Sequence, residues 1–458
     1  MSLHRAILPI CLMLGACVPS LNTETATRAA FQMENAAALP PMKTFSAPRP
    51  VRPVQSNSDI ARDFLDLVFS MESGRDLPVL TRFEGPIRVR VTGQPPAHLG
   101  LDLGRLLHRL RTEAGIDIDM AQGGAAQITI QAIPRAEIRK ALPQAACFVV
   151  PNITDISQYA LARRTARTDW ARLDSRSQIA VFLPSDAAPQ EVRDCLHEEL
   201  AQALGPLNDL YRLPDSVYND DNVHTILTGY DMLILRAIYA PELQSGMTRA
   251  QVADRLPGLL ARMNPAGQNQ APTRLANTPR PWVNAVQKAL GPGVTPIERR
   301  AAANEAISIA RVMGWQDHRR GFSHYALGRL LQPSDPAGAE AQFREADRYF
   351  AGSPDMALHR AYVASQLAAF AVARGQGDVA LALVAPHLDV AARHENAALL
   401  ATLMLLRAEA LDLTNRGAEA QSVRMDSLGW ARYGFGADWA VRAKQREISQ
   451  LSPLRGRS

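Results

Sequence analysis

The sequence predicts two folded parts, a mixed α/β domain over residues 59–263 and an all-helical repeat region over residues 295–458. Three observations lead to this fold class. In the first part, segments of alternating apolar residues lie between segments with helical apolar spacing. In the second part, a short sequence recurs about every 40 residues, which indicates stacked helical units. The composition, 47% hydrophobic and 21% charged, is ordinary for a folded globular protein.

The charge balance argues against one class of partner. Lys and Arg number 50, Asp and Glu number 45, and no run of five or six basic residues occurs. Domains that bind nucleic acid usually carry a basic patch or stripe. We therefore expect no nucleic-acid partner.

The first residues have the pattern of an export signal. A charged start precedes the apolar run 6–14, which is too short to span a membrane. The tetrapeptide 14–17, Leu-Gly-Ala-Cys, resembles the bacterial lipobox, which implies cleavage before Cys17 and acylation of its thiol. Residues 1–16 are thus predicted to be a lipoprotein signal peptide, and the alternative is an ordinary signal peptide with an incidental cysteine. The resemblance implies an envelope protein that faces the periplasm and is anchored to membrane lipid through Cys17, and we expect the outer membrane.

Residues 17–58 are predicted to be the lipidated N-terminus and a tether. Prolines recur within 39–42, 47–50 and 51–54 without apolar periodicity. This composition favours a semi-extended spacer, which would hold the folded part away from the membrane.

The α/β domain is expected to alternate helices with short strands. Helices are predicted over 60–69, 99–114 and 189–204, where apolar residues recur at helical spacing, and the last one ends at a Gly-Pro pair. Strands are predicted where apolar residues alternate or run together, over 87–93, 116–118, 127–130, 146–150 and 178–183.

The last of these helices carries the most informative motif. A zinc peptidase of the His-Glu-x-x-His type needs two histidines one helical turn apart and a general-base Glu after the first. Counted from His197, the second ligand position holds Ala201, which cannot bind a metal. Counted from Glu198, that position holds Gln202 on the same helix face, and Glu199 occupies the general-base position.

The second register resembles the metzincin pattern, which continues with a glycine and a third histidine. Gly205 and Asn208 occupy those positions. Residues 216–219 resemble the methionine-turn segment, although no Met is present, and residues 227–239 resemble the closing metzincin helix. The core Cys-Leu-His-Glu-Glu-x-x-Gln-x-Leu-Gly, which begins at Cys195, is similar to the bacterial lipoprotein family known as domain of unknown function 2927. The resemblance implies an α+β zincin-like domain without the three zinc-binding histidines.

The donor set left at this site consists of oxygen atoms. Glu198, Gln202 and Asn208 suit a hard cation such as Ca²⁺ or Mg²⁺ better than Zn²⁺. The alternative is a metal-free polar network in which Asn208 caps a turn. A further alternative is that His197 and His224 together bind a metal. We expect no cofactor other than such a divalent metal.

Two further cysteines remain after the signal peptide and the lipidation site. A protein exported from the bacterial cytoplasm folds in an oxidising space, so Cys147 and Cys195 are most simply paired in a disulfide. The bond would tie the strand 146–150 to the motif helix. Two separate buried thiols are the alternative.

The repeat region follows a segment, 264–294, that is predicted to be a linker because turn-forming residues crowd its start. The pentapeptide Gly-Ala-Glu-Ala-Gln begins at Gly338 and again at Gly417, and Gly377 lies between them, at steps of 39 and 40. Each unit is predicted to be two antiparallel helices, the second of which starts at these glycines. The first helices are expected over 324–331, 356–374 and 397–415.

The units resemble tetratricopeptide repeats, and a related all-α helical solenoid is the alternative. Stacked helix pairs bind peptides or partner proteins, which implies an envelope protein or peptide as partner. Arg329, Arg344 and Arg360 are candidate contacts to its acidic segments. The alternative for these arginines is a solvated helix face.

Two functions are open. The first is an envelope lipoprotein whose metzincin-like domain is non-catalytic and whose repeats bind a partner. The second is an active metallopeptidase with an unusual ligand set and Glu199 as general base. The missing imidazoles favour the first, because water bound to a weaker Lewis acid keeps too high a pKa for efficient peptide hydrolysis.

Overall fold

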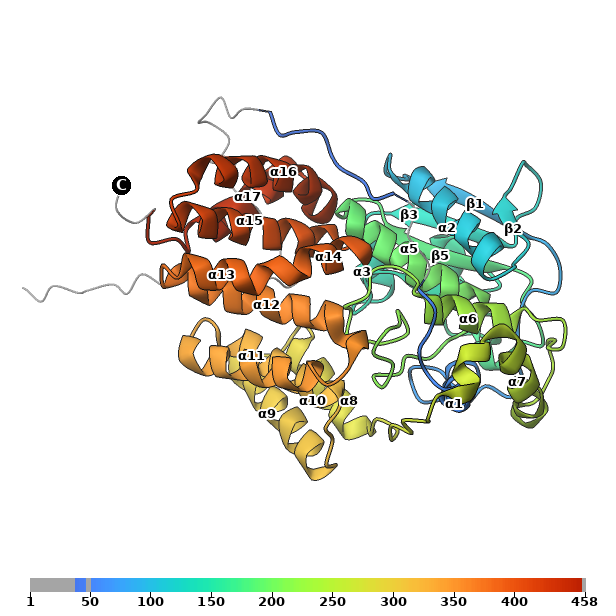
Figure 1. The fold of residues 1–458 in the computed structure, drawn as a ribbon. Coiled ribbons are helices and arrows are strands. Elements are labelled where there is room, and N and C mark those ends of the chain that lie inside the picture. Colours follow the sequence, from blue (N-terminus) through green and yellow to red (C-terminus); the bar gives the residue numbers. More distant parts are fainter. Residues whose placement is uncertain (1–37, 47–50, 455–458) are drawn as a thin grey trace, which may run out of the picture.

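The computed structural model describes residues 38–46 and 51–454. Within these residues the chain forms a mixed α/β domain and then a run of paired helices, which lie side by side (Figure 1). The predicted order of an α/β part and an all-helical part is therefore confirmed. No helix in the described part of the chain is long and apolar enough to cross a membrane.

The α/β domain is built on a five-stranded sheet in the order β2-β1-β3-β5-β4. β1 pairs in parallel with β2 and β3, β3 pairs in parallel with β5, and β4 runs antiparallel to β5. All residues of β5 are buried, as expected for a central strand covered on both faces. All five predicted strands are present, with bounds that shift by three residues or fewer. The strands are β1 (Ile87–Gly93), β2 (Ile118–Met120), β3 (Ile128–Ile133), β4 (Phe148–Pro151) and β5 (Ile179–Pro184).

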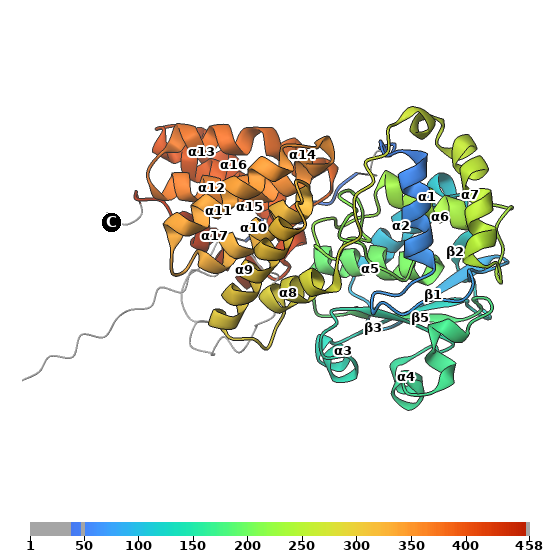
Figure 2. The same ribbon diagram turned by 90° about the horizontal axis from the view of Figure 1, so that it is seen from below.

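Seven α-helices cover the two faces of this sheet. In Figure 2, α1, α2, α5, α6 and α7 lie on one face, and the short helices α3 and α4 lie on the other. The larger core lies between the sheet and the first group, and a smaller core contains Ile138, Phe148 and Phe182. The helices are α1 (Asn57–Val68), α2 (Leu99–Glu113), α3 (Arg135–Ala141), α4 (Ile156–Ala162), α5 (Pro189–Leu204), α6 (Gly229–Ile238) and α7 (Arg249–Met263).

The second part consists of antiparallel helix pairs. Its repeating first helices, α10, α12 and α15, begin at residues 318, 357 and 397, which gives the predicted steps of 39 and 40. The helices are α8 (Arg280–Leu290), α9 (Pro296–Val312), α10 (His318–Leu331), α11 (Pro336–Phe350), α12 (Ala357–Ala373), α13 (Gly377–Val384), α14 (Leu388–Arg393), α15 (Ala397–Leu413), α16 (Gly417–Phe435) and α17 (Asp438–Ser449).

The segment 264–294, which the sequence predicts to be a linker, contains α8. Trp282 and Val286 lie one helical turn apart on this helix and are buried in the core of the first repeats. The indole nitrogen of Trp282 donates to Ser323 Oγ at 3.0 Å. The repeat region therefore begins within this segment.

Part of the tether packs against the repeat region. Residues 38–46 have no helix or strand, as their prolines predict, yet they run along α16. Phe45 is buried and stacks on Trp430 with ring centroids 4.5 Å apart. The backbone N–H of Lys43 donates to the carbonyl of Gly429 at 3.0 Å. This stretch acts as a strap rather than as a free spacer.

The α/β domain packs against one edge of the repeat region, where the first helices begin. The contacts there are polar and buried. His318 Nε2 lies 2.7 Å from Tyr211 O, and His359 Nε2 lies 2.7 Å from Asp221 Oδ2. The edge of the repeats is thus occupied by this chain's own first domain.

The N-terminal half of α5 forms the centre of this interface. Gln190 donates to Asn396 Oδ1 at 3.1 Å and accepts from Ala398 N at 2.9 Å. Arg193 pairs with Glu395 at 3.0 Å, and their side chains are 5% and 10% exposed. The helix that carries the sequence motif is therefore also the joint between the two parts.

Candidate functional site

The C-terminal end of α5, where the motif lies, is held by a buried arginine and a glycine. Arg176 donates to the carbonyls of Gln202 and Gly205 at 2.5 Å each. These carbonyls at the end of the helix would otherwise need another partner. A Cβ atom on Gly205 would lie 2.4 Å from Ile238 Cδ1, so any larger residue here would displace the side chain of Ile238 on α6. The motif side chains therefore project from a fixed helix end.

The four residues predicted for the site lie on the second half of α5 and just beyond it. Asn208 donates through its amide nitrogen to the carbonyl of Asp66 at 2.9 Å, which ties the loop after α5 to α1. Glu199 is buried, and Glu198 and Gln202 are partly buried. Metal binding by Glu198, Gln202 and Asn208 remains a prediction.

The motif glutamates belong to a larger group of carboxylates that influence one another. Burial, together with the charges of Asp220 and Glu72, raises the pKa of Glu198 to about 7. Burial also raises the pKa of Glu199 well above its usual range, with contributions from Glu198, Asp209 and Glu72. We call these five residues, Glu72, Glu198, Glu199, Asp209 and Asp220, the carboxylate cluster.

The carboxylate cluster has too little positive charge around it for all its members to ionise. Asp209 shares the pattern, since burial and then the charge of Glu198 raise its pKa, and its Oδ1 is buried without a hydrogen-bond partner. The positive charge of Arg280 opposes the rise in pKa at Glu72 and Asp220, but burial outweighs it at both residues. Buried carboxylates with raised pKa values keep protons near neutral pH. No three of these five residues bring ligand atoms within 4.8 Å of one another. The sequence motif pointed to Glu198 and Glu199, whereas Glu72, Asp209 and Asp220 come from loops without a motif.

The two histidines proposed as an alternative metal pair have different neighbours. The Nδ1 atom of His197 accepts from the backbone N–H of Leu227 at 3.1 Å. Burial lowers the pKa of His197 well below its usual range, so the ring is neutral and can accept this bond. His224 contacts His394 instead, with ring centroids 5.5 Å apart. His197 thus holds the loop before α6 onto α5.

The predicted disulfide is confirmed. Cys147, just before β4, is bonded to Cys195 in the middle of α5, with Cα atoms 5.9 Å apart. The bond fixes the motif helix to the edge strand of the sheet. The lipidation site, Cys17, lies outside the described residues, so its acylation stays a prediction.

Two of the three arginines proposed as partner contacts are in ion pairs within the repeats. Arg344 pairs with Glu340 at 2.5 Å, and Arg360 pairs with Asp347 at 2.8 Å. Their side chains are 65% and 40% exposed, so they remain open to water. The guanidinium of Arg329 lies over the ring of Tyr325. A role in partner binding stays a prediction for all three.

The fold and the site define a class of protein in which an α/β domain with a carboxylate-rich motif helix is joined to a helical repeat region. Residues 57–258 match the family model described as "Protein of unknown function (DUF2927)", which confirms the family expected for this domain. No curated protein and no solved structure matches the chain.

Proposed function

We propose that this protein is a lipid-anchored envelope scaffold. Its α/β domain is a zincin-like domain without peptidase activity, and its tetratricopeptide-like repeats bind an envelope protein or peptide. One observation carries the proposal. The positions at which a peptidase of this pattern would hold zinc carry Glu198, Gln202 and Asn208 in place of three histidines. The amide nitrogen of Asn208 donates to a backbone carbonyl of α1.

The joint between the two parts supports a scaffold. The same helix that carries the motif holds the repeat region through Gln190 and Arg193. Motions that open and close a substrate cleft would have to break these buried polar contacts. We therefore infer that α5 sets the orientation of the repeats.

The strap supports anchoring on the side of the repeat region. Cys17 precedes Ala38, the first described residue, by 21 positions, and an extended chain of that length spans at most about 75 Å. Because residues 38–46 pack on α16, an acyl chain on Cys17 would keep that side of the repeats within this distance of the membrane.

The second candidate function is a metallopeptidase with Glu199 as general base. The uncompensated charge of the carboxylate cluster favours it, because a divalent cation would offset that charge. However, a general base must be ionised, and burial raises the pKa of Glu199 well above its usual range. A cation held by carboxylate and amide oxygens would also polarise a bound water less than zinc held by imidazoles does. The scaffold is therefore the better supported function.

A single substitution tests whether the cluster is free of metal. Glu198 has a higher pKa in the folded protein, about 7, than its ordinary value of 4.5, so the folded state binds the extra proton. Stability should then fall as pH rises from about 4.5 to about 7. We expect Glu198→Gln to remove this loss and to raise the free energy of unfolding at pH 8 by about 2 kcal/mol, a figure reduced for the partial exposure of Glu198.

The measurement is urea unfolding of the chain from residue 17 with Cys17→Ser, at pH 5, 6, 7 and 8. Glu305→Gln, at an exposed position of α9, is the matched control and should leave the pH profile unchanged. A bound cation would reverse the sign, because Glu198→Gln would then destabilise the protein at pH 8 when that cation is present. That reversal would show that the carboxylate cluster holds a metal and would reject the scaffold function.

A further inference from the structure

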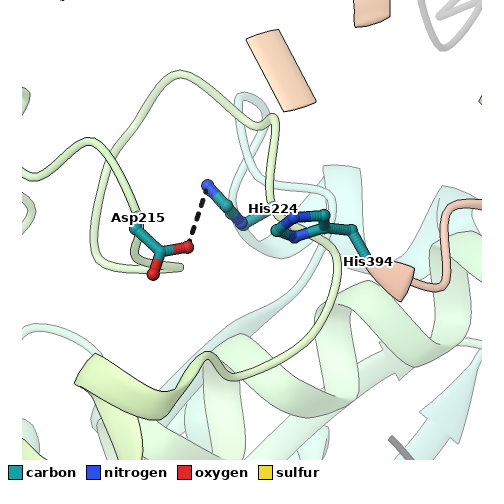
Figure 3. Close-up of side chains that lie close together, drawn as sticks. All are labelled: Asp215, His224 and His394. Carbon is teal, nitrogen blue, oxygen red and sulfur yellow. Dashed lines mark ion pairs between the residues drawn. The ribbon is translucent and has the colours of Figure 1, made fainter. Parts of the chain in front are cut away.

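Three metal-ligating side chains meet where the α/β domain touches the repeat region. Asp215 and His224 lie in the loop between α5 and α6, and His394 lies at the C-terminal end of α14 (Figure 3). One ligand atom of each residue lies within 4.8 Å of the others. Across residues 38–46 and 51–454, no other group of three His, Cys, Asp or Glu residues meets this distance. The group is separate from the carboxylate cluster and shares no residue with it.

The spacing of these atoms is close to that of a metal site. His224 Nε2 lies 3.8 Å from Asp215 Oδ1, and the rings of His224 and His394 have centroids 5.5 Å apart. In a tetrahedral zinc site with bonds near 2.1 Å, neighbouring ligand atoms are roughly 3.4 Å apart. Side-chain rotations that move each ligand atom by about 1 Å would thus let all three atoms bind one ion. Without an ion, Pro214 O, which is 3.1 Å from His224 Nε2, is the partner of that ring nitrogen.

The surroundings keep both imidazoles in the form that binds metal. Burial and the charge of the nearby His359 together lower the pKa of His224 to about 4. Burial likewise lowers the pKa of His394 to about 3. A neutral ring has one nitrogen without a proton. Because His224 Nε2 donates to Pro214 O, metal binding at Nε2 would move that ring proton to Nδ1. His359 has its ring centroid 6.0 Å from that of His224, and its own Nδ1 is buried without a hydrogen-bond partner.

We propose that Asp215, His224 and His394 form a binding site for a divalent transition-metal ion of the zinc class, which links the two parts of the protein. Two imidazoles and one carboxylate are a ligand set that Zn²⁺ takes, and they leave a fourth position open. Two ligands come from the α/β domain and one from the repeat region. A bound ion therefore adds a link beside the pair of Arg193 and Glu395.

Zinc titration of the purified chain tests this site. The chain from residue 17 with Cys17→Ser is freed of metal with a chelator and titrated with Zn²⁺ by calorimetry. We expect one equivalent to bind with a dissociation constant in the micromolar range or below, and to raise the midpoint of thermal unfolding. His224→Gln and His394→Gln should each weaken binding at least about 10-fold, because each removes one of three ligands. The visible spectrum of bound Co²⁺ reports imidazole coordination in the unaltered chain, so this evidence does not depend on how the variants fold.

Two control variants separate this site from other sources of zinc affinity. His108→Gln removes a histidine from an exposed position of α2, and Glu199→Gln alters the carboxylate cluster. Both should keep the affinity of the unaltered chain. The proposal is overturned if that chain binds no stoichiometric zinc, if binding survives in both His224→Gln and His394→Gln, or if Glu199→Gln abolishes it.

Discussion

Replacing Arg193 with methionine is expected to lower the free energy of unfolding by about 3–5 kcal/mol, the loss typical of breaking a buried ion pair from one side. Arg193 and Glu395 are both nearly buried, and Arg193 also donates to the backbone carbonyl of Glu395. Its guanidinium lies over the ring of Tyr433, 5.2 Å from the centroid. Methionine keeps the length of the side chain but removes the ion-pair partner of the Glu395 carboxylate.

Urea unfolding measured by circular dichroism and tryptophan fluorescence gives this free energy. Arg88→Met is the matched control, since Arg88 pairs with Asp117 on an exposed surface and should cost less than about 1 kcal/mol. Adding Glu395→Gln to the Arg193 variant should recover part of the loss, because it removes the unpaired charge. Equal losses for Arg193→Met and Arg88→Met would show that the joint does not depend on this pair.

Replacing both Cys147 and Cys195 with serine is expected to cost about 3–4 kcal/mol. The disulfide closes a loop of 48 residues, and chain entropy in the unfolded state accounts for a loss of about this size. The bond also fixes α5 at its midpoint, between the residues of the joint and those of the motif. The effect should therefore reach both parts of the protein.

The same unfolding experiment, repeated with and without a reducing agent, measures the contribution of the disulfide. Reduction should lower the stability of the unaltered chain to that of the double variant, and the double variant should not respond to the reductant. Alkylation of the unfolded, unreduced protein should detect no free thiol at either position. Labelling of both cysteines without reduction would contradict the bond.

Local patterns in the sequence account for much of the fold. The helix predicted over 189–204 has those bounds in the structure, and the strand over 87–93 does as well. Alternating or helical spacing of apolar residues fixed these elements, because each buries one face. The repeat steps of 39 and 40 could also be predicted from the sequence, because every unit has a glycine near the start of its second helix.

Other features depend on contacts between residues far apart in the chain, which local patterns do not reveal. Arg193 and Glu395 are separated by 202 positions, and His394 lies 170 positions after His224. The helix α8 was missed because its flanking segment resembles a linker, although Trp282 is fully buried within it. The motif residues were found from their spacing, but Glu72 joins them from the loop after α1, and Asp209 and Asp220 join them from the loop between α5 and α6.

The absence of peptidase activity is tested most directly by hydrolysis of unstructured protein substrates. The chain from residue 17 with Cys17→Ser is incubated with casein and with a mixed peptide library, in Zn²⁺, Ca²⁺, Mg²⁺ or chelator, next to its Glu199→Gln variant. We predict that the two proteins give the same background cleavage under every condition. Metal-dependent cleavage by the unaltered chain that Glu199→Gln abolishes would contradict the scaffold function and identify an active metallopeptidase.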